Sequence, residues 1–301
     1  MIQNYIFSPS DLEDYLLCPF RFYASACLKV KPETEWEVEL TPPEIGRLLH
    51  KILEKFLRQK KNQGEKERIL SLMDSEIALL QKNRPHLSQA LLKNQKKRIT
   101  RALLSFLEQE ESDTAPRKTL IPKYFEWSFG KDSPPLLLTT PGGPIKIRGR
   151  VDRIDVDPIQ KRFLVVDYKT GSTKITGNQI RAGKSLQLPL YILAVQQLLL
   201  PDYEPIGGLY YQLSDMTRDS GILHMDRLPD FLEIHPRNSS LIPAVQWDKT
   251  FEEIKGHVAH IVSEIQKSEF PSNPEPCDAY CPYRDICRVR NHFSQISPSK
   301  N

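Results

Sequence analysis

Three charged side chains lie in two short segments that the sequence predicts to be neighbouring strands. Asp152 lies in the first segment, residues 149–155, and Asp167 and Lys169 end the second, which begins with the apolar run 163–166. Residues two apart on a strand share a face, so Asp167 and Lys169 point the same way, and a hairpin could bring Asp152 beside them. Two carboxylates can hold a divalent cation that activates water, and an ammonium adds positive charge for a phosphate. These are the groups that metal-assisted phosphodiester hydrolysis requires.

The ordinary alternative is that these side chains are surface charges on a hairpin, where acid–lysine pairs are common. The apolar run before Asp167 favours the functional interpretation, because it places the end of the strand beside a core. His50 has a similar alternative, since a single histidine on an amphipathic helix is usually structural or solvated. As neutral imidazole it could ligate a divalent metal, and it would favour manganese somewhat over magnesium.

Clustered cysteines near the carboxyl end indicate a metal centre. No secretion signal precedes them, so we expect a reducing, cytoplasmic compartment, in which clustered thiols favour metal over disulfides. The spacing C-x3-C-x5-C suits zinc or an iron–sulfur cluster, and it does not separate the two. A fifth cysteine, Cys27, is expected to be a small buried apolar residue. The remaining four are Cys18, Cys277, Cys281 and Cys287.

Composition places the chain among ordinary globular proteins. The 301 residues are 39% hydrophobic and 27% charged, with a net charge of +4 that permits nucleic-acid binding without demanding it. No run approaches the roughly 18 apolar residues that cross a membrane, so no membrane partner is expected. Basic residues cluster in two predicted helices, which could attract phosphate or could be solvated faces. The blocks are Lys93, Lys96, Lys97, Arg98 and Arg101, and Arg58, Lys60 and Lys61.

Helical and strand patterns alternate along the chain. They predict an α/β or α+β core, with residues 215–246 irregular. Helices are expected at 9–27, 44–61, 65–84, 87–111, 178–200 and 248–268. Strands are expected near 122–129, 134–139, 144–157, 161–169 and 206–213.

Several motifs together resemble the RecB-like branch of the PD-(D/E)XK nuclease superfamily. The matches run from about residue 8 to residue 288 in the order of the family. The amino-terminal matches are S-P-S at 8–10, C-P-F-R-F at 18–22 and G-R-L-L-H at 46–50, which ends at His50. The later matches are G-R-V-D-R-I-D at 149–155, D-Y-K-T-G at 167–171 and Q-L-P-L-Y at 187–191. The resemblance implies one nuclease domain over 1–301, with a central mixed sheet flanked by helices and a restriction-endonuclease-like catalytic core at 122–213. It also implies a helical insertion at 62–115 and a cysteine-bearing tail at 270–290.

The resemblance also implies roles for individual residues. The metal, magnesium or manganese, would be held by the side chains of His50, Asp152 and Asp167 and by the backbone carbonyl of Tyr168. Lys169 would be the catalytic lysine. Gln187 and Tyr191 would lie near DNA or near that lysine. Glu126 weakly matches a glutamate of an early family strand, whereas Arg153 and Asp155 are expected to pair structurally.

The cysteine arrangement resembles the iron–sulfur subset of these nucleases, which includes AddB-type subunits and CRISPR-adaptation nucleases. It implies a [4Fe–4S] cluster on Cys18, Cys277, Cys281 and Cys287, tying the two ends of the chain together as a structural clip. The chain departs from the commonest pattern, because three residues rather than two separate Cys277 from Cys281. Cys277 is therefore the least secure of the four ligands.

These features favour a metal-dependent DNA nuclease of repair or recombination, an exonuclease acting on single strands or DNA ends. One alternative is a non-catalytic iron–sulfur DNA-binding or scaffold subunit of a helicase–nuclease complex. Others are a CRISPR-adaptation nuclease and a zinc-binding structural protein, which would leave the D-Y-K segment unexplained. The sequence contains no G-x-x-x-x-G-K-[ST] motif, so these residues carry no ATP-driven motor of their own. RecB-like nucleases are often fused to, or assembled with, helicases, so the resemblance implies a helicase subunit as a partner to be tested.

Overall fold

A mixed six-stranded sheet forms the centre of the computed structural model, which describes residues 4–31, 38–59, 64–117, 119–171, 174–272, 277 and 281–287. Its strand order is β2-β5-β6-β7-β8-β9. The pairs β6–β7 and β8–β9 are parallel, and the other pairs are antiparallel. The strands are β2 (Ile121–Phe129), β5 (Gly149–Asp157), β6 (Arg162–Lys169), β7 (Glu204–Gln212), β8 (Ser220–His224) and β9 (Leu241–Ile242). The mixed sheet flanked by helices confirms the expected fold class.

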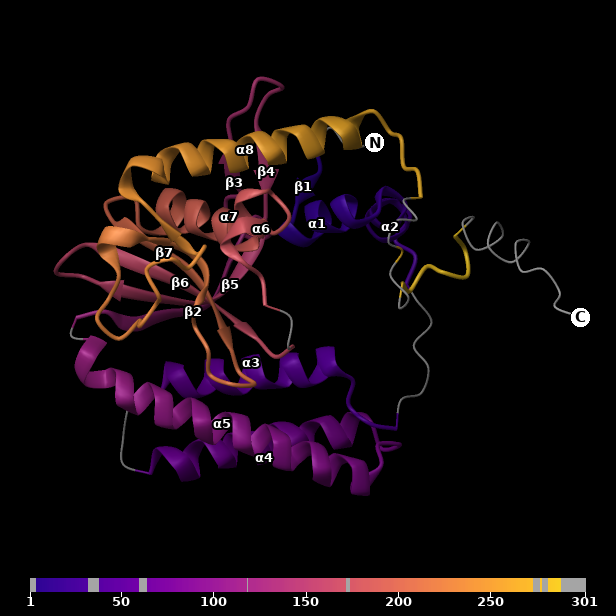
Figure 1. Cartoon of the computed structure of the whole chain (residues 1–301). Coiled ribbons are helices and arrows are strands. Elements are labelled where there is room, and N and C mark those ends of the chain that lie inside the picture. The colour runs from indigo at the N-terminus through magenta and orange to yellow at the C-terminus, as the bar shows by residue number, and fades with distance from the viewer. Residues whose placement is uncertain are drawn as a thin grey trace, which may run out of the picture.

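Helices cover both faces of this sheet (Figure 1). On one face α7 contacts the strands, with α6, α8 and α1 beside it; on the other, α3 contacts β2 and packs with α4 and α5. Around the sheet the helices are α1 (Pro9–Leu17), α2 (Pro19–Phe22), α3 (Pro42–Arg58), α4 (Glu65–Asn83), α5 (Gln89–Arg117), α6 (Gly177–Arg181), α7 (Gln187–Ala194) and α8 (Ala244–Gln266). A smaller sheet contains β1 (Ile6–Phe7), β4 (Ile145–Ile147) and β3 (Leu136–Leu138), in that order.

Strand β6 serves two hydrophobic cores. Phe163 and Val165 lie in the core under α7 and α8, whereas Leu164 and Val166 lie in the core formed with α3, α4 and α5. Successive side chains of a strand point to opposite faces, so a strand covered on both faces reads as a continuous apolar run. The apolar run that precedes the catalytic candidates therefore reflects burial on both sides.

Local capping explains where α1 and α3 begin. The Ser8 hydroxyl accepts from the backbone of Asp11, and the Asp11 carboxylate accepts from the backbone of Ser8. Thr41 and Glu44 form a similar capping box at α3, which has proline at its first position. Such reciprocal caps satisfy amide groups that the first helical turn leaves unpaired. They fix the start of the helix that carries His50.

Four predicted elements need correction. The expected strand at 144–157 is divided into β4 and β5, which belong to different sheets. The expected helix at 9–27 is interrupted at Cys18, which is extended because Pro19 follows it, and it then continues as α2 and the π-helix η1 (Tyr23–Cys27). The expected helix at 178–200 is divided into α6, α7 and the π-helix η2 (Val195–Leu199). The region 215–246, expected to be irregular, contains β8, the short 3-10 helix η3 (Met225–Arg227) and β9. These strands are too short for a local signal, and they exist because they pair with β7 and with each other.

A buried ionic network fastens α5 to the sheet. The guanidinium of Arg153, 1% exposed, donates to both carboxylate oxygens of Asp155 at 2.6 and 2.8 Å, which confirms their expected pairing. It also donates to Glu110 of α5 at 2.9 Å. Arg218 pairs with Asp113 one turn further along α5. Helix α5 therefore has a fixed position relative to the strands that carry the catalytic candidates.

Candidate active site

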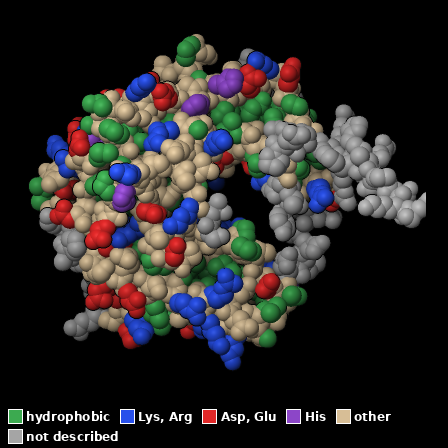
Figure 2. Space-filling model, viewed as in Figure 1, with side chains coloured by type: hydrophobic (Ala, Val, Ile, Leu, Met, Phe, Trp, Pro, Cys, Tyr) green, Lys and Arg blue, Asp and Glu red, His purple; other side chains and the backbone are tan. Residues whose placement is uncertain are grey.

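A cavity of about 720 Å³ opens between α3, α7 and the strands β2, β5 and β6. Figure 2 shows the molecule hollowed between α1 and α3, beside the sheet. The metal and catalytic candidates from three distant parts of the chain all line this cavity: His50, Asp152, Asp167, Tyr168, Lys169, Gln187 and Tyr191. The fold thus brings together every residue that the sequence predicted for the catalytic site.

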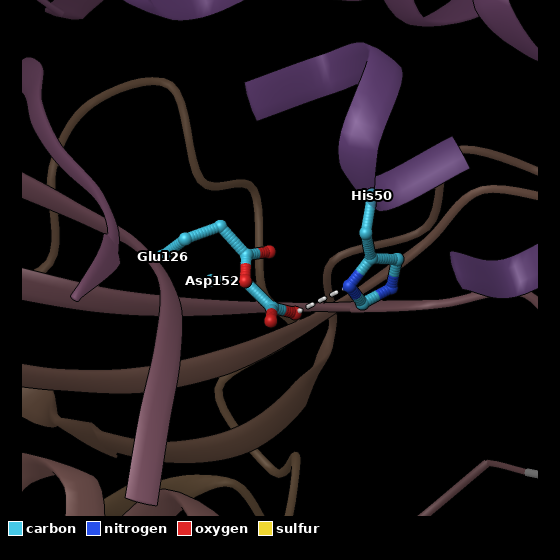
Figure 3. Close-up of side chains that lie close together, drawn as sticks. All are labelled: His50, Glu126 and Asp152. Atoms are coloured by element: carbon cyan, nitrogen blue, oxygen red, sulfur yellow. Dashed lines mark ion pairs between the residues drawn. The ribbon is translucent and has the colours of Figure 1, made fainter. Parts of the chain in front are cut away.

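Three side chains in this cavity form a group that could hold a metal ion. His50 on α3, Glu126 on β2 and Asp152 on β5 each offer a ligand atom, and these atoms lie within 4.8 Å of one another (Figure 3). Nδ1 of His50 lies 3.3 Å from Oδ2 of Asp152. One imidazole nitrogen and two carboxylates suit a divalent cation such as manganese or magnesium. Within the described residues, no other group of three or more His, Cys, Asp or Glu side chains has its ligand atoms within 4.8 Å of one another.

The protonation of His50 reflects the same surroundings. Its Nε2 lies 3.1 Å from the backbone carbonyl of Tyr168, so both ring nitrogens face oxygen acceptors. Burial lowers the pKa of His50, but the hydrogen bond and charge of Asp152 outweigh burial and raise that pKa overall. The metal-free site therefore holds a proton on this ring more tightly than a free imidazole does, and a divalent cation would compete with that proton.

Glu126 has an unusual backbone conformation. Its φ is +50°, in the left-handed region that non-glycine residues seldom adopt. The register of β2 with β5 is the same on both sides of this residue. Its carboxylate is largely buried and pairs with Arg150 at 2.8 Å. Burial raises the pKa of Glu126, and the charge of Asp152 raises it further. Strained backbone conformations of this kind cluster at functional sites, which supports a role for Glu126 in the cavity. The sequence motifs had indicated this residue only weakly.

Asp167, Lys169 and Gln187 form a second, connected group. The ammonium of Lys169 lies 2.7 Å from Oδ2 of Asp167 and donates to Oε1 of Gln187 at 2.8 Å. The amide of Gln187 donates to Oδ1 of Asp167 at 2.6 Å. Asp167 thus contacts the lysine and the glutamine, and it lies outside the close group around His50. Its role as a metal ligand stays a prediction.

Burial controls the ionisation of this second group. Burial raises the pKa of Asp167 to about 6, although the charge of Lys169 lowers it, and the charge of Asp152 raises it further. Burial lowers the pKa of Lys169, but the charge of Asp167 and their hydrogen bond outweigh burial and raise it overall. Lys169 therefore remains an ammonium at neutral pH.

Tyr168 is held from both sides of the sheet. Its backbone N–H donates to Oδ2 of Asp152 at 2.9 Å, and its carbonyl faces His50. On the opposite face its hydroxyl accepts from Arg153 at 3.2 Å. The predicted carbonyl ligand thus lies beside the His50 group, on a residue whose side chain is fixed by the ionic network under α5.

Two further residues support α7. The hydroxyl of Tyr191 accepts from Gln187 at 3.5 Å, and its ring packs against Phe129. Its expected place near DNA or the catalytic lysine stays a prediction. The carboxylate of Glu13 on α1 accepts from the backbone N–H of Leu186 at 2.7 Å, at the start of α7. The sequence motifs missed Glu13, because a single acid in an amino-terminal helix carries no local signal of this long-range contact.

The basic block of α5 is divided by the structure. Lys96 pairs with Asp74 of α4 at 2.6 Å, whereas Arg98 and Arg101 line a second cavity. Lys93 and Lys97 are exposed. In the other block, Arg58 donates to the carbonyl of Phe125 at 2.6 Å and is structural. Lys60 and Lys61 lie outside the described residues.

The cysteine-bearing tail lies near the segment that carries Cys18. The backbone N–H of Phe20 donates to the carbonyl of Pro271 at 3.2 Å, and Tyr23 stacks on Phe270 at 4.9 Å between ring centroids. The hydroxyl of Tyr283 donates to the carbonyl of Val30 at 3.2 Å. Exposure differs among the four candidate ligands: Cys277 is exposed, and the partly buried ones are Cys18, Cys281 and Cys287.

Comparison with known proteins gives a consistent result. A family model described as the PD-(D/E)XK nuclease superfamily matches residues 6–288. Three similar proteins are each named as a subunit of an ATP-dependent helicase/deoxyribonuclease. In Thermoanaerobacter sp. (strain X514) the identity is 24%, over 95% of this chain and 30% of that protein. In Exiguobacterium sibiricum the identity is 29%, over 97% of this chain and 31% of that protein. In Moorella thermoacetica the identity is 31%, over 68% of this chain and 19% of that protein.

The chain therefore spans less than a third of the length of each of these relatives. Within the part of the chain that the structure describes, no helix has both the length and the apolar character needed to cross a membrane.

Proposed function

Because the chain belongs to the PD-(D/E)XK nuclease superfamily, we propose that it is a metal-dependent deoxyribonuclease that hydrolyses phosphodiester bonds in DNA repair or recombination. The observation that carries this proposal is the meeting of two groups in one cavity. One group is a histidine with two carboxylates, and the other is an aspartate with a lysine and a glutamine. The first group suits a cation, and the second keeps an ammonium charged beside it.

In this proposal each group of side chains has one task. His50, Glu126 and Asp152 hold the cation, with Asp167 and the Tyr168 carbonyl as further ligands. Bound magnesium or manganese would activate water and neutralise charge on the phosphate. Lys169 supplies a positive charge for the phosphate or for the attacking water. Gln187 holds both Lys169 and Asp167 by hydrogen bonds, so it orients the pair rather than reacting itself.

A non-catalytic scaffold is the main alternative, and the site argues against it. A binding module needs no buried aspartate with a raised pKa beside a charged lysine, because burying such groups costs free energy. The relatives are named as subunits of a helicase/deoxyribonuclease, which supports assembly with an ATP-driven helicase. We expect that partner to deliver single-stranded ends to the cavity.

The [4Fe–4S] cluster is part of the same proposal. Cys18 begins the segment that contacts the tail through Phe20 and Tyr23, which supports a clip between the two ends. Such a clip would be structural, since it closes a loop that contains nearly the whole chain. Iron, sulfide and zinc analysis of protein purified without oxygen tests it. We expect Cys281→Ala and Cys287→Ala to lose iron and Cys27→Ala to retain it; stoichiometric zinc in place of iron would contradict the cluster.

A cleavage assay tests the nuclease itself. End-labelled single-stranded and duplex DNA is incubated with magnesium or manganese and with wild-type, Lys169→Ala or Lys249→Ala protein. Lys249 lies on α8 with its side chain 77% exposed, so it controls for loss of a lysine elsewhere. We expect metal-dependent degradation by the wild type and by Lys249→Ala, and a large loss with Lys169→Ala. Equal activity of Lys169→Ala would refute the assignment.

A further inference from the structure

A second cavity of about 310 Å³ lies on the other side of α3 from the metal site. It is enclosed by α3, α5 and the segments that follow β6 and β7. Side chains of Ile45, Leu49 and Ile99 contribute apolar surface, and Leu213 and Met216 add to it. The cavity is therefore an apolar recess in the surface next to the proposed catalytic centre.

Helix α3 separates the two cavities. Gly46 and His50, four residues apart, line the metal cavity, whereas Ile45 and Leu49 line the second one. Residues four apart share one face of a helix, so each pair faces its own cavity. Thr170, directly after Lys169, also lines the second cavity, and a Cβ at Gly46 would lie 3.1 Å from its hydroxyl. Helix α3 and the end of β6 therefore border both the recess and the proposed catalytic centre.

Two exposed arginines border the apolar recess. Arg98 and Arg101 of α5 line it and are both exposed, and among the described residues neither forms an ion pair. Figure 2 shows Lys and Arg side chains gathered on the lower part of this face, where α5 lies, beside a hollow that contains hydrophobic side chains. Guanidinium groups bind phosphates and stack on planar rings. Apolar surface with nearby cations suits a nucleobase attached to its phosphate.

We propose that this recess receives the unstacked base of the nucleotide next to the scissile phosphate, while Arg98 and Arg101 contact the adjoining backbone phosphate. The inference rests on the proposed nuclease function and names its substrate as single-stranded DNA. A volume of about 310 Å³ is at the lower end for ligand pockets, ~300–1,000 Å³, and it has room for a single base. A base inside a duplex would first have to leave its stack, which costs free energy.

An abasic-site scan tests the base pocket without any cleavage. Binding is measured by fluorescence anisotropy in EDTA, with hairpins whose single-stranded overhang carries one abasic site at successive positions. For the wild type we expect one position, or two adjacent ones, to weaken binding at least about fivefold. Ala102→Phe, which fills the cavity, should reduce that penalty below about twofold. Ser214→Trp, at an exposed position on the rim, makes the same test if Ala102→Phe folds poorly.

A charge-reversal variant tests the phosphate contacts. We expect Arg98→Glu with Arg101→Glu to weaken binding of every overhang at least about tenfold and to lower its salt dependence, because these contacts release counterions. Lys249→Glu is the matched control and should change binding less than about twofold. A flat abasic profile in the wild type, or an unchanged penalty in both filling variants, would overturn the base pocket. These readouts are independent of cleavage, so they separate failure of the pocket from failure of the nuclease assignment.

Discussion

The guanidinium of Arg153 on β5 donates to the Glu110 carboxylate on α5 over 2.9 Å, in an almost fully buried contact. The same guanidinium donates to the hydroxyl of Tyr168, whose backbone contacts Asp152 and faces His50. One ion pair therefore joins the helix that carries Arg98 and Arg101 to the strand that carries the catalytic candidates. It fixes the proposed DNA-binding helix relative to the metal site.

Removing Glu110 should destabilise the protein substantially. Glu110→Ala leaves part of the charge of Arg153 uncompensated inside the protein, and breaking a buried pair in this way costs about 3 kcal/mol of unfolding free energy. Glu108→Ala is the control, because Glu108 is exposed on the same helix and should cost less than about 0.5 kcal/mol. Urea denaturation monitored by circular dichroism measures both. Similar losses in the two variants would show that the buried contact contributes nothing specific.

Glu126→Ala should weaken metal binding without weakening the metal-free fold. The carboxylate belongs to the group around His50, so its loss should reduce manganese affinity by roughly tenfold or more. The metal-free variant should be at least as stable as the wild type, since a buried carboxylate with a raised pKa is removed. Isothermal titration calorimetry gives the affinity, and Asp132→Ala, at an exposed position, is the control. Unchanged affinity in Glu126→Ala would exclude it as a ligand.

The ionisation of Asp167 should make the metal-free protein pH-dependent. Burial, opposed by Lys169 and assisted by Asp152, raises its pKa from 3.8 to about 6, so the folded protein keeps a proton that the unfolded chain has lost. The stabilisation is complete below the unfolded pKa and is lost as pH rises through about 6. Asp167→Asn should remove this dependence and stabilise the protein in EDTA at neutral pH by up to about 3 kcal/mol.

Urea denaturation of both proteins across the acidic range measures this effect. Parallel pH profiles for wild type and Asp167→Asn would contradict the raised pKa. Cleavage by the wild type should increase over the same pH range, because Asp167 can ligate a cation only after it loses its proton.

Gly149→Ala should disturb the packing behind the site. A Cβ at this position would lie 2.6 Å from Cε1 of Tyr191 and 2.8 Å from Cζ of Phe129, so rings must move. Overpacking of this kind costs about 1–3 kcal/mol. Gly142→Ala is the control, since its nearest neighbour would be the Thr140 hydroxyl at 3.9 Å. Thermal unfolding compares the two, and equal melting temperatures would show that the Tyr191 ring yields freely.

Much of the site could be predicted because it depends on local patterns. The hairpin of β5 and β6 follows from two apolar runs around a turn, and the start of α3 follows from Thr41, proline and Glu44. Other features depend on the folded backbone. Glu126 lies close to Asp152 with its own backbone at a φ of +50°, and no composition pattern specifies that conformation. One partner of Asp167, Gln187, lies on α7, and a loop and the short helix α6 separate α7 from Asp167 along the chain.

Strand β6 pairs with β7 along its whole length and with β5 from Arg162 to Val166. Its amide protons should therefore exchange with solvent only when the entire domain opens. His50 and Glu126 instead come from a covering helix and from the edge strand β2, which belong to less protected layers. The proposed catalytic residue Lys169 thus lies on the most persistent part of the fold, while two of the three close metal candidates lie on parts that can open first. Under mild denaturation, cation binding should disappear while the central sheet still resists exchange.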